Sequence, residues 1–182
     1  MQYDRDKNTI TTTRLTLRPF ILSDAEEVSR LCNNYNLYKG TLNLPYPYPI
    51  DSAIGWINTH QEAFENEASY TFAITDQSSG ILYGAIGISH NKADRNGEVG
   101  YWIGEDFWGN GYASEALKAL IDFVFQYKNY HRVFGRFLEF NPASGQVMHK
   151  VGMNYEGTQI DHVLKDGEFK TIVLYGIINP SL

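Results

Sequence analysis

A short glycine loop between a predicted strand and a long amphipathic helix constrains this chain more than any other feature. The strand is the run 98–103, and the loop carries Gly109 and Gly111. From near Tyr112, apolar residues recur at the spacing of one helical face, which predicts a helix of about four turns. A strand, a tight loop and a helix in this order fit a mixed α and β fold. The residues of the apolar face are Ala113, Ala116, Leu117, Leu120, Ile121 and Val124.

The first turn of this predicted helix has the properties of an anion site. Its N–H groups have no partner inside the helix, and the helix dipole adds partial positive charge there. The two glycines let the backbone approach a phosphate closely. No lysine follows, which excludes a nucleoside-triphosphate P-loop, and the chain has no G-x-G-x-x-G, which argues against a dinucleotide-binding Rossmann loop. From spacing alone, an anion site and a plain tight turn both stay open.

The rest of the chain predicts one α+β domain over residues 1–182, with the element order β-α-α-β-β-β-α-β-α-β-β. A capping box over 23–26 is expected to start the first helix, and Asp51 is expected to cap the second. Asn96-Gly97 predicts a hairpin turn before the strand that leads into the glycine loop. The polar residues within the segment 1–12 are expected to fray.

The C-terminal third of the chain contains a shorter helix and two strands in its predicted order. Asn141 followed by Pro142 predicts the start of this helix, with asparagine as the N-cap and proline in the first turn. Asp166-Gly167 predicts the turn that joins the last two strands. Exposed strands in this region could pair with a second subunit, so a homodimer stays open.

Composition narrows the class of protein. The net charge of −6 argues against a nucleic-acid partner, which needs a concentrated basic surface. Cys32 is the single cysteine, so an intrachain disulfide is impossible, and we expect it in the core rather than as a nucleophile. No apolar run reaches the roughly 18 residues of a membrane helix, and no secretory signal is visible. The histidines lack metal-ligand spacing. A soluble cytoplasmic protein without metal, membrane or nucleic-acid partners is expected.

The segment Gly104–Leu117, which reads G-E-D-F-W-G-N-G-Y-A-S-E-A-L, resembles motif A of the GNAT superfamily of acyl-CoA N-acyltransferases. The runs 13–19 and 98–103 resemble more narrowly the branch that includes the RimJ and RimL ribosomal-protein N-terminal acetyltransferases. Asn141 with Ser144, followed by the run 150–153, matches that branch too. The resemblance covers the chain from about Thr13 to Ile177. It implies a GNAT-like, mostly antiparallel mixed sheet flanked by helices.

The resemblance also implies acetyl-CoA as co-substrate. The loop would bind the pyrophosphate through the backbone N–H groups of Trp108, Gly109, Asn110, Gly111, Tyr112 and Ala113. The superfamily often has arginine or glutamine where this chain has Trp108, so one possible charged contact is lost. In the family, the strand before the loop diverges from its neighbour at a bulge and pairs with the pantetheine arm. Here that strand carries Tyr101, Trp102 and Ile103, and an N–H near Tyr101 or Trp102 would stabilise the oxyanion.

The same resemblance suggests three polar side chains for the chemistry. Glu98 is the candidate general base, acting through a water; the alternative is a solvated glutamate after a hairpin turn. Asn141 is expected both to cap its helix and to bond the pantetheine amide. Ser144 is the candidate acid for the departing thiolate, and the alternative is a neutral serine of a first helical turn. Many superfamily members use a tyrosine on this helix, and the run 142–150 has none.

The implied reaction is direct attack of a primary amine on the thioester of acetyl-CoA. The amine could be a protein N-terminal α-amine or a small molecule, and the acidic chain does not favour a ribosomal partner. A non-catalytic acyl-CoA-binding module is the alternative from another class. Tyr46 and Tyr48, in a proline-rich loop, are expected either to line the acceptor pocket or to pack within their own loop.

Overall fold

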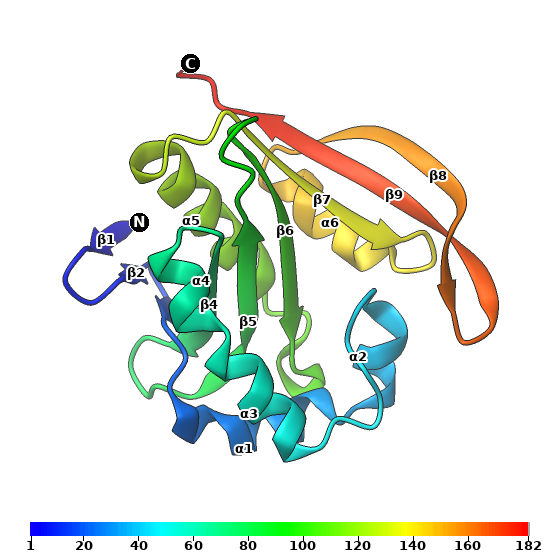
Figure 1. Cartoon of the computed structure of the whole chain (residues 1–182), viewed down its shortest axis with the longest axis horizontal. Coiled ribbons are helices and arrows are strands. Elements are labelled where there is room, and N and C mark those ends of the chain that lie inside the picture. Colours follow the sequence, from blue (N-terminus) through cyan, green and yellow to red (C-terminus); the bar gives the residue numbers. More distant parts are fainter. Residues whose placement is uncertain (182) are drawn as a thin grey trace.

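The computed structural model describes residues 1–181, and its frame is a nine-stranded sheet in the order β1-β2-β3-β4-β5-β6-β7-β9-β8 (Figure 1). Neighbouring strands are antiparallel except β6 and β7, which run parallel. The strands are β1 (Gln2–Asp4), β2 (Thr9–Thr11), β3 (Leu15–Arg18), β4 (Ser69–Asp76), β5 (Leu82–Ser89), β6 (Asn96–Ile103), β7 (Arg132–Leu138), β8 (Asn154–Lys165) and β9 (Glu168–Ile178).

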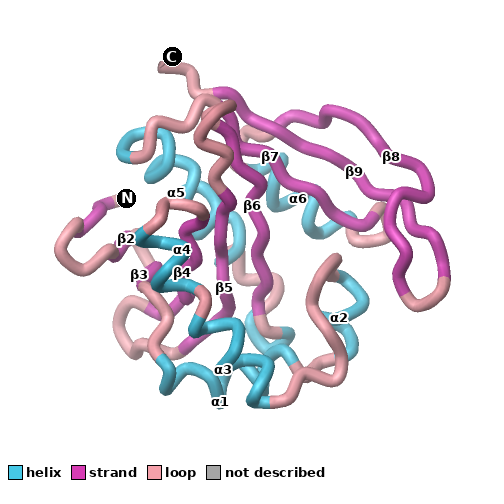
Figure 2. Tube along the Cα trace, in the orientation of Figure 1, coloured by secondary structure: helices cyan, strands magenta, loops and turns pink. Residues whose placement is uncertain are grey.

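Helices flank both faces of the sheet, as Figure 2 shows. Helices α5 and α6 lie against one face, while α1 and α3 pack together over the other. The predicted fold class, a mixed and mostly antiparallel sheet flanked by helices, is therefore confirmed. The helices are α1 (Ala25–Cys32), α2 (Tyr35–Gly40), α3 (Ile50–Asn58), α4 (His60–Glu65), α5 (Tyr112–Tyr127) and α6 (Pro142–Lys150), with short 3-10 turns at Leu22–Asp24 (η1) and Glu105–Phe107 (η2).

The main core lies between the sheet and α5, and the period of two in the strands explains its composition. Tyr70, Phe72 and Ile74 of β4 point to one face and are fully buried. Phe123 of α5 packs edge-on against Tyr70 and Phe72, with ring centroids 5.7 and 5.8 Å apart. Ala73, between them in sequence, belongs to the second cluster under α1 and α3. Successive side chains of a strand therefore supply two separate apolar layers.

The sheet splits between its two parallel strands. Residues 96–99 of β6 pair with 132–135 of β7, and the pairing ends at Val99 and Gly135. Beyond that point β6 stays paired with β5 up to Ile103, and β7 stays paired with β9. Figure 1 shows the two strands diverging. The predicted divergence is present, but the predicted bulge is not, because β6 keeps an unbroken register against β5.

The N-terminal segment, whose polar residues were expected to fray, contains β1 and β2. Strands β1 and β2 pair as a hairpin at the edge of the sheet. Ile10 is fully buried, and the ring of Tyr3 lies 4.7 Å from that of Phe123. Ile10 and Tyr3 therefore anchor the segment to the core. The sequence did not reveal this, because most residues of the segment are polar.

The hairpin turn predicted at Asn96-Gly97 and the capping box predicted at 23–26 are both wrong. Asn96 begins β6, and the reversal lies in residues 91–95, where Arg95 has a φ of 51°. A Cβ at Gly97 would lie 2.0 Å from the Ser89 carbonyl oxygen, so close strand approach requires this glycine. Ser23 lies inside η1, and the neighbouring Asp24 carboxylate accepts the Ile21 N–H instead.

The helices between β3 and β4 are also more divided than predicted. Asp51 lies inside α3, whose N-cap is Pro49, so its predicted capping role is wrong. The predicted second helix breaks at Thr59 into α3 and α4. Helix α2 is an additional element whose N-cap, Asn34, accepts the Leu37 N–H at 2.9 Å.

Truncation of the central aromatic contact tests this description of the core. Because Phe123 is fully buried, we expect Phe123→Ala to lower the free energy of unfolding by about 3–5 kcal/mol. Urea denaturation followed by circular dichroism measures the change. Phe169 is 65% exposed, so Phe169→Ala is the matched control and should change stability by less than about 0.5 kcal/mol. Equal losses in both variants would contradict this core.

Candidate active site

A cavity of about 1010 Å³ occupies the opening between β6 and β7. Its walls come from the diverging half of β6, Arg136 and Phe137 of β7, the first turns of α5 and α6, and the segment after α2. Among the described lining residues are all the predicted site residues except Asn110. The split in the sheet therefore brings together side chains from both halves of the chain.

The backbone of β6 offers hydrogen-bonding groups to this cavity. The N–H of Gly104 donates to the Tyr83 carbonyl at 2.9 Å, which sets the alternation of the antiparallel ladder with β5. Trp102 therefore turns its N–H and C=O toward β5, and Tyr101 and Ile103 turn theirs toward the opening. The Ile103 carbonyl accepts the indole N–H of Trp108 at 2.6 Å. Trp102, grouped with Tyr101 in the prediction, lines the cavity through its side chain.

The glycine loop adopts a conformation that needs both glycines. Gly109 and Gly111 have φ angles of 78° and 79°, in the left-handed region. Gly111 is the N-cap of α5, so the first N–H groups of the helix lie directly beyond the loop. The Asn110 amide donates to the Phe107 and Trp108 carbonyls, both at 3.1 Å. Asn110 therefore braces the loop from outside the cavity.

Two hydroxyl groups meet on the α6 side of the opening. The Tyr101 hydroxyl lies 3.0 Å from Ser144 Oγ and 3.0 Å from the Ser144 carbonyl oxygen. Burial raises the pKa of Tyr101 to about 12, so the phenol is protonated at neutral pH. The sequence predicted only a backbone role for Tyr101. Tyr101 lies two residues after the buried Val99 on β6, so their side chains share one face of the strand. This spacing is the signal that could have placed the Tyr101 side chain toward α6.

A carboxylate and a guanidinium pair on the opposite face of the sheet. Arg136 donates to both Glu98 oxygens, through Nε at 2.8 Å and Nη2 at 3.0 Å, and each side chain is 31% exposed. Gly100 lies on the same face as Glu98, and a Cβ built on it would meet no described atom within 4 Å. The surface of the sheet beside this ion pair is therefore open at Gly100. Arg136 was not predicted, because its role depends on the register of β7.

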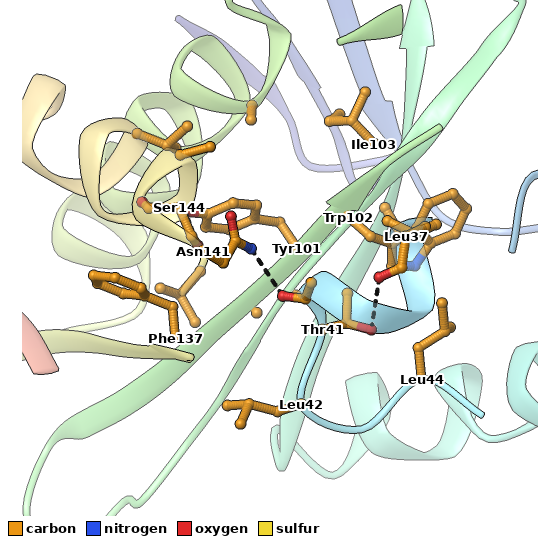
Figure 3. Close-up of a pocket in the computed structure, with 18 of the residues that line it drawn as sticks. Leu37, Thr41, Leu42, Leu44, Tyr101, Trp102, Ile103, Phe137, Asn141 and Ser144 are labelled. Atoms are coloured by element: carbon orange, nitrogen blue, oxygen red, sulfur yellow. Dashed lines mark hydrogen bonds between the residues drawn. The ribbon is translucent and has the colours of Figure 1, made fainter. Parts of the chain in front are cut away.

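Asn141 occupies the N-cap position of α6, but its side chain does not cap the helix. Within residues 1–181 it makes no capping hydrogen bond. Its amide donates instead to the Gly40 carbonyl at 2.8 Å, which ties the start of α6 to the end of α2 (Figure 3). The predicted side-chain cap is thus wrong. One amide hydrogen and the amide oxygen remain for other partners.

Each of the two tyrosines in the proline-rich loop has a different environment, either at the cavity or packed on neighbouring rings. Tyr48 is buried and lines the cavity. Tyr46 is 46% exposed and packs on Tyr35 and Tyr38, with ring centroids 5.5 and 5.6 Å away. One tyrosine of the loop therefore faces the cavity, and the other packs on the rings of α2.

Comparison with known proteins identifies the family. Residues 14–154 match the family model described as an acetyltransferase (GNAT) domain. The chain belongs to the GNAT acetyltransferase family. The uncharacterized N-acetyltransferase YoaA of Bacillus subtilis (strain 168) is 28% identical over 173 residues, covering 93% of this chain and 96% of that protein.

Two relatives of the GNAT chain belong to the branch expected from its motifs. The [ribosomal protein uS5]-alanine N-acetyltransferase of Escherichia coli (strain K12) is 26% identical over 138 residues, covering 75% of this chain and 70% of that protein. The structure of RimL, a ribosomal L7/L12 α-N-protein acetyltransferase in complex with coenzyme A, has a TM-score of 0.86. It is 20% identical, covers 93% of this chain and 97% of its own, and shows the shared fold. The resemblance to GNAT N-acetyltransferases with RimJ and RimL relatives is confirmed.

Neither Cys32 nor His60 is among the described residues that line the cavity. Burial raises the pKa of Cys32 to about 12, as a core thiol requires. Burial lowers the pKa of His60 to about 4, and its ring nitrogens have no hydrogen-bond partner among the described residues. Across residues 1–181, no group of three or more potential ligands could hold a metal ion. In the same range, no helix has the length and apolar character needed to cross a membrane.

The glycine loop yields a direct test of acetyl-CoA binding. Gly109→Ala places a side chain in the left-handed region, at a cost of about 1–2 kcal/mol. We expect the Kd for acetyl-CoA, measured by calorimetry, to rise roughly tenfold, because 1.4 kcal/mol corresponds to a factor of ten. A Cβ added at Gly109 or at Gly55 of α3 would meet no described atom within 4 Å. Gly55→Ala is therefore the matched control. Unchanged affinity in Gly109→Ala would show that the loop is not used.

Proposed function

We propose that this GNAT enzyme transfers the acetyl group of acetyl-CoA to a primary amine by direct attack on the thioester. One observation carries the proposal: the opening between β6 and β7 connects the glycine loop, the Tyr101–Ser144 pair and Glu98 in one cavity. These groups match the three needs of amide formation, which are a bound thioester, a proton donor and a proton acceptor.

Acetyl-CoA would lie along the free edge of β6. Its pyrophosphate would accept hydrogen bonds from N–H groups of the loop and the first turn of α5. Its pantetheine arm would pair with the backbone groups of Tyr101 and Ile103 that face the cavity, and with the Asn141 amide. Because the Ile103 carbonyl already accepts the Trp108 indole, the N–H of Ile103 and the C=O of Tyr101 are the partners available to the arm, and the Tyr101 N–H is left for the thioester.

The thioester carbonyl would accept a hydrogen bond from the Tyr101 N–H. This donor is fixed by the ladder with β5, so it needs no reorganisation when the oxyanion develops. The Ser144 hydroxyl would donate to the departing thiolate. Tyr101 Oη, 3.0 Å from Ser144 Oγ, would orient that hydroxyl and supply a second proton to the pair.

The amine would approach from the face that holds Glu98. Gly100 leaves the sheet surface on that face open, and small residues of the neighbouring strands extend this surface; they are Ser69, Thr71, Gly87 and Ser89. Glu98 would accept the ammonium proton through a water, with Arg136 holding the carboxylate in place. An α-amine, with a pKa near 8, loses its proton more easily than a lysine near 10.4. The Escherichia coli relative is named for a protein alanine, which makes peptide N-termini the first acceptors to test.

The hydroxyl pair gives a test of the acid step. We expect Ser144→Ala and Tyr101→Phe each to lower kcat by roughly 100-fold, the lower range for removal of an acid–base group. The double variant should lose little more, because groups that act as a unit are not additive. Steady-state thiol release measures kcat, and calorimetry should give an acetyl-CoA Kd within about twofold of the wild type. Wild-type turnover in Ser144→Ala would remove the acid role.

The ion pair gives a separate test of the base. Glu98→Gln removes the carboxylate, whereas Arg136→Gln leaves it in place without its partner. If Glu98 is the base, Glu98→Gln should lower kcat/KM by roughly 100-fold near neutral pH and by less at high pH, where the free amine has already lost its proton. Arg136→Gln keeps the carboxylate and should lose less near neutral pH. If the pair were only structural, the two variants would have the same pH–rate profile. That outcome would leave acceptor binding as the function of this face.

A further inference from the structure

Arg14, the residue before β3, reaches across the molecule to the start of α5. Its backbone N–H donates to Glu115 Oε1 at 2.9 Å, and its Nε donates to Glu115 Oε2 at 2.7 Å. Its Nη1 donates to the Asn110 carbonyl oxygen at 3.0 Å. One guanidinium thus joins the first turn of α5 to the middle of the glycine loop.

The surroundings of Arg14 add to this attachment. Its guanidinium carbon lies 4.8 Å from the centre of the Tyr112 ring, within cation–π distance. A Cβ on Gly111 would lie 3.6 Å from its Nη2. The Thr12 hydroxyl donates to Glu115 Oε1 at 2.7 Å. Burial raises the pKa of Glu115, but hydrogen bonds from Thr12 and Arg14 outweigh it and lower the pKa overall. The carboxylate is therefore ionised when it holds Arg14.

The contact with the Asn110 carbonyl matters because of its position. Asn110 lies between two glycines in the left-handed region, and glycine samples more backbone conformations than any other residue. An anion site needs several N–H groups to converge on one point. A bond to the peptide between the two glycines restricts both at once. The loop 108–113 contains no lysine or arginine of its own, so Arg14 also brings positive charge beside it.

We propose that Arg14 is a positioning residue for acetyl-CoA: it holds the glycine loop in the conformation that binds the pyrophosphate. The inference rests on the proposed use of acetyl-CoA. Arg14 does not occur among the described residues that line the cavity, so it acts through the loop. Its pair with Glu115 is exposed on the arginine side, at 47%, and such pairs contribute little to global stability. Loss of Arg14 should therefore affect binding of the pyrophosphate more than folding.

The test compares two ligands that differ in the pyrophosphate. Coenzyme A carries it on a pantetheine arm that ends in a thiol, and S-acetylpantetheine lacks it but has the same arm as a thioester. We expect Arg14→Gln to raise the Kd for coenzyme A, measured by calorimetry, about tenfold, while the KM for S-acetylpantetheine changes less than about twofold. Arg132 also forms an ion pair, with Glu156, away from the loop, so Arg132→Gln is the matched control and should alter neither value.

A conservative variant separates geometry from charge. Lysine keeps the charge but cannot donate to Glu115 and Asn110 as a planar fork, so Arg14→Lys should bind coenzyme A as weakly as Arg14→Gln. Wild-type affinity in Arg14→Lys would overturn the positioning role, because charge alone would suffice. Equal weakening toward both ligands, or no weakening toward coenzyme A, would also overturn it. If the wild-type protein itself failed to bind coenzyme A, the proposed function would fail instead.

Discussion

The end of pairing between β6 and β7 is the constraint on which the rest of this molecule depends. Backbone N–H and C=O groups inside a protein need partners, and a strand that loses its neighbour exposes a row of them. In this chain the row belongs to Tyr101 and Ile103, and it faces a cavity rather than another strand. A ligand with an extended amide backbone, such as a pantetheine arm, is suited to complete such an edge. The split in the sheet thus accounts both for the cavity and for the kind of molecule that can fill it.

The pleat of β6 then separates the two halves of the proposed chemistry. Tyr101 turns its side chain toward α6, where it meets Ser144, while Glu98 and Gly100 turn toward the opposite face. In the proposed reaction, donor groups for the thioester and acceptor groups for the amine therefore come from opposite faces of one strand. Because β5 holds that strand in an unbroken register, the two sets keep a fixed relation to each other. Arg14, outside the cavity, extends the same rigidity to the loop that begins α5.

Local signals in the sequence predicted the parts whose structure is local. Gly109 and Gly111, followed by the apolar face of α5, were sufficient to predict the loop and helix, since positive φ and helical period are properties of neighbouring residues. Predictions failed where tertiary contacts decide. Asn141 has the right residue type and position for a cap, yet its amide bonds Gly40, about 100 residues away in sequence. Gly97 is required by the approach of another strand, and Arg136 depends on the register of β7; no pattern within a few residues contains either fact.

The central claim is that acetyl-CoA and an amine react in the opening between β6 and β7. The most direct test is a calorimetric titration of the wild-type protein with acetyl-CoA, followed by addition of peptide and small-molecule amines with thiol release recorded. We predict saturable binding of acetyl-CoA and amine-dependent release of the coenzyme A thiol, matched by an acetylated amine in the mass spectrum. Binding without release for any amine would support a non-catalytic acyl-CoA-binding module instead. Absence of acetyl-CoA binding would contradict the central claim itself.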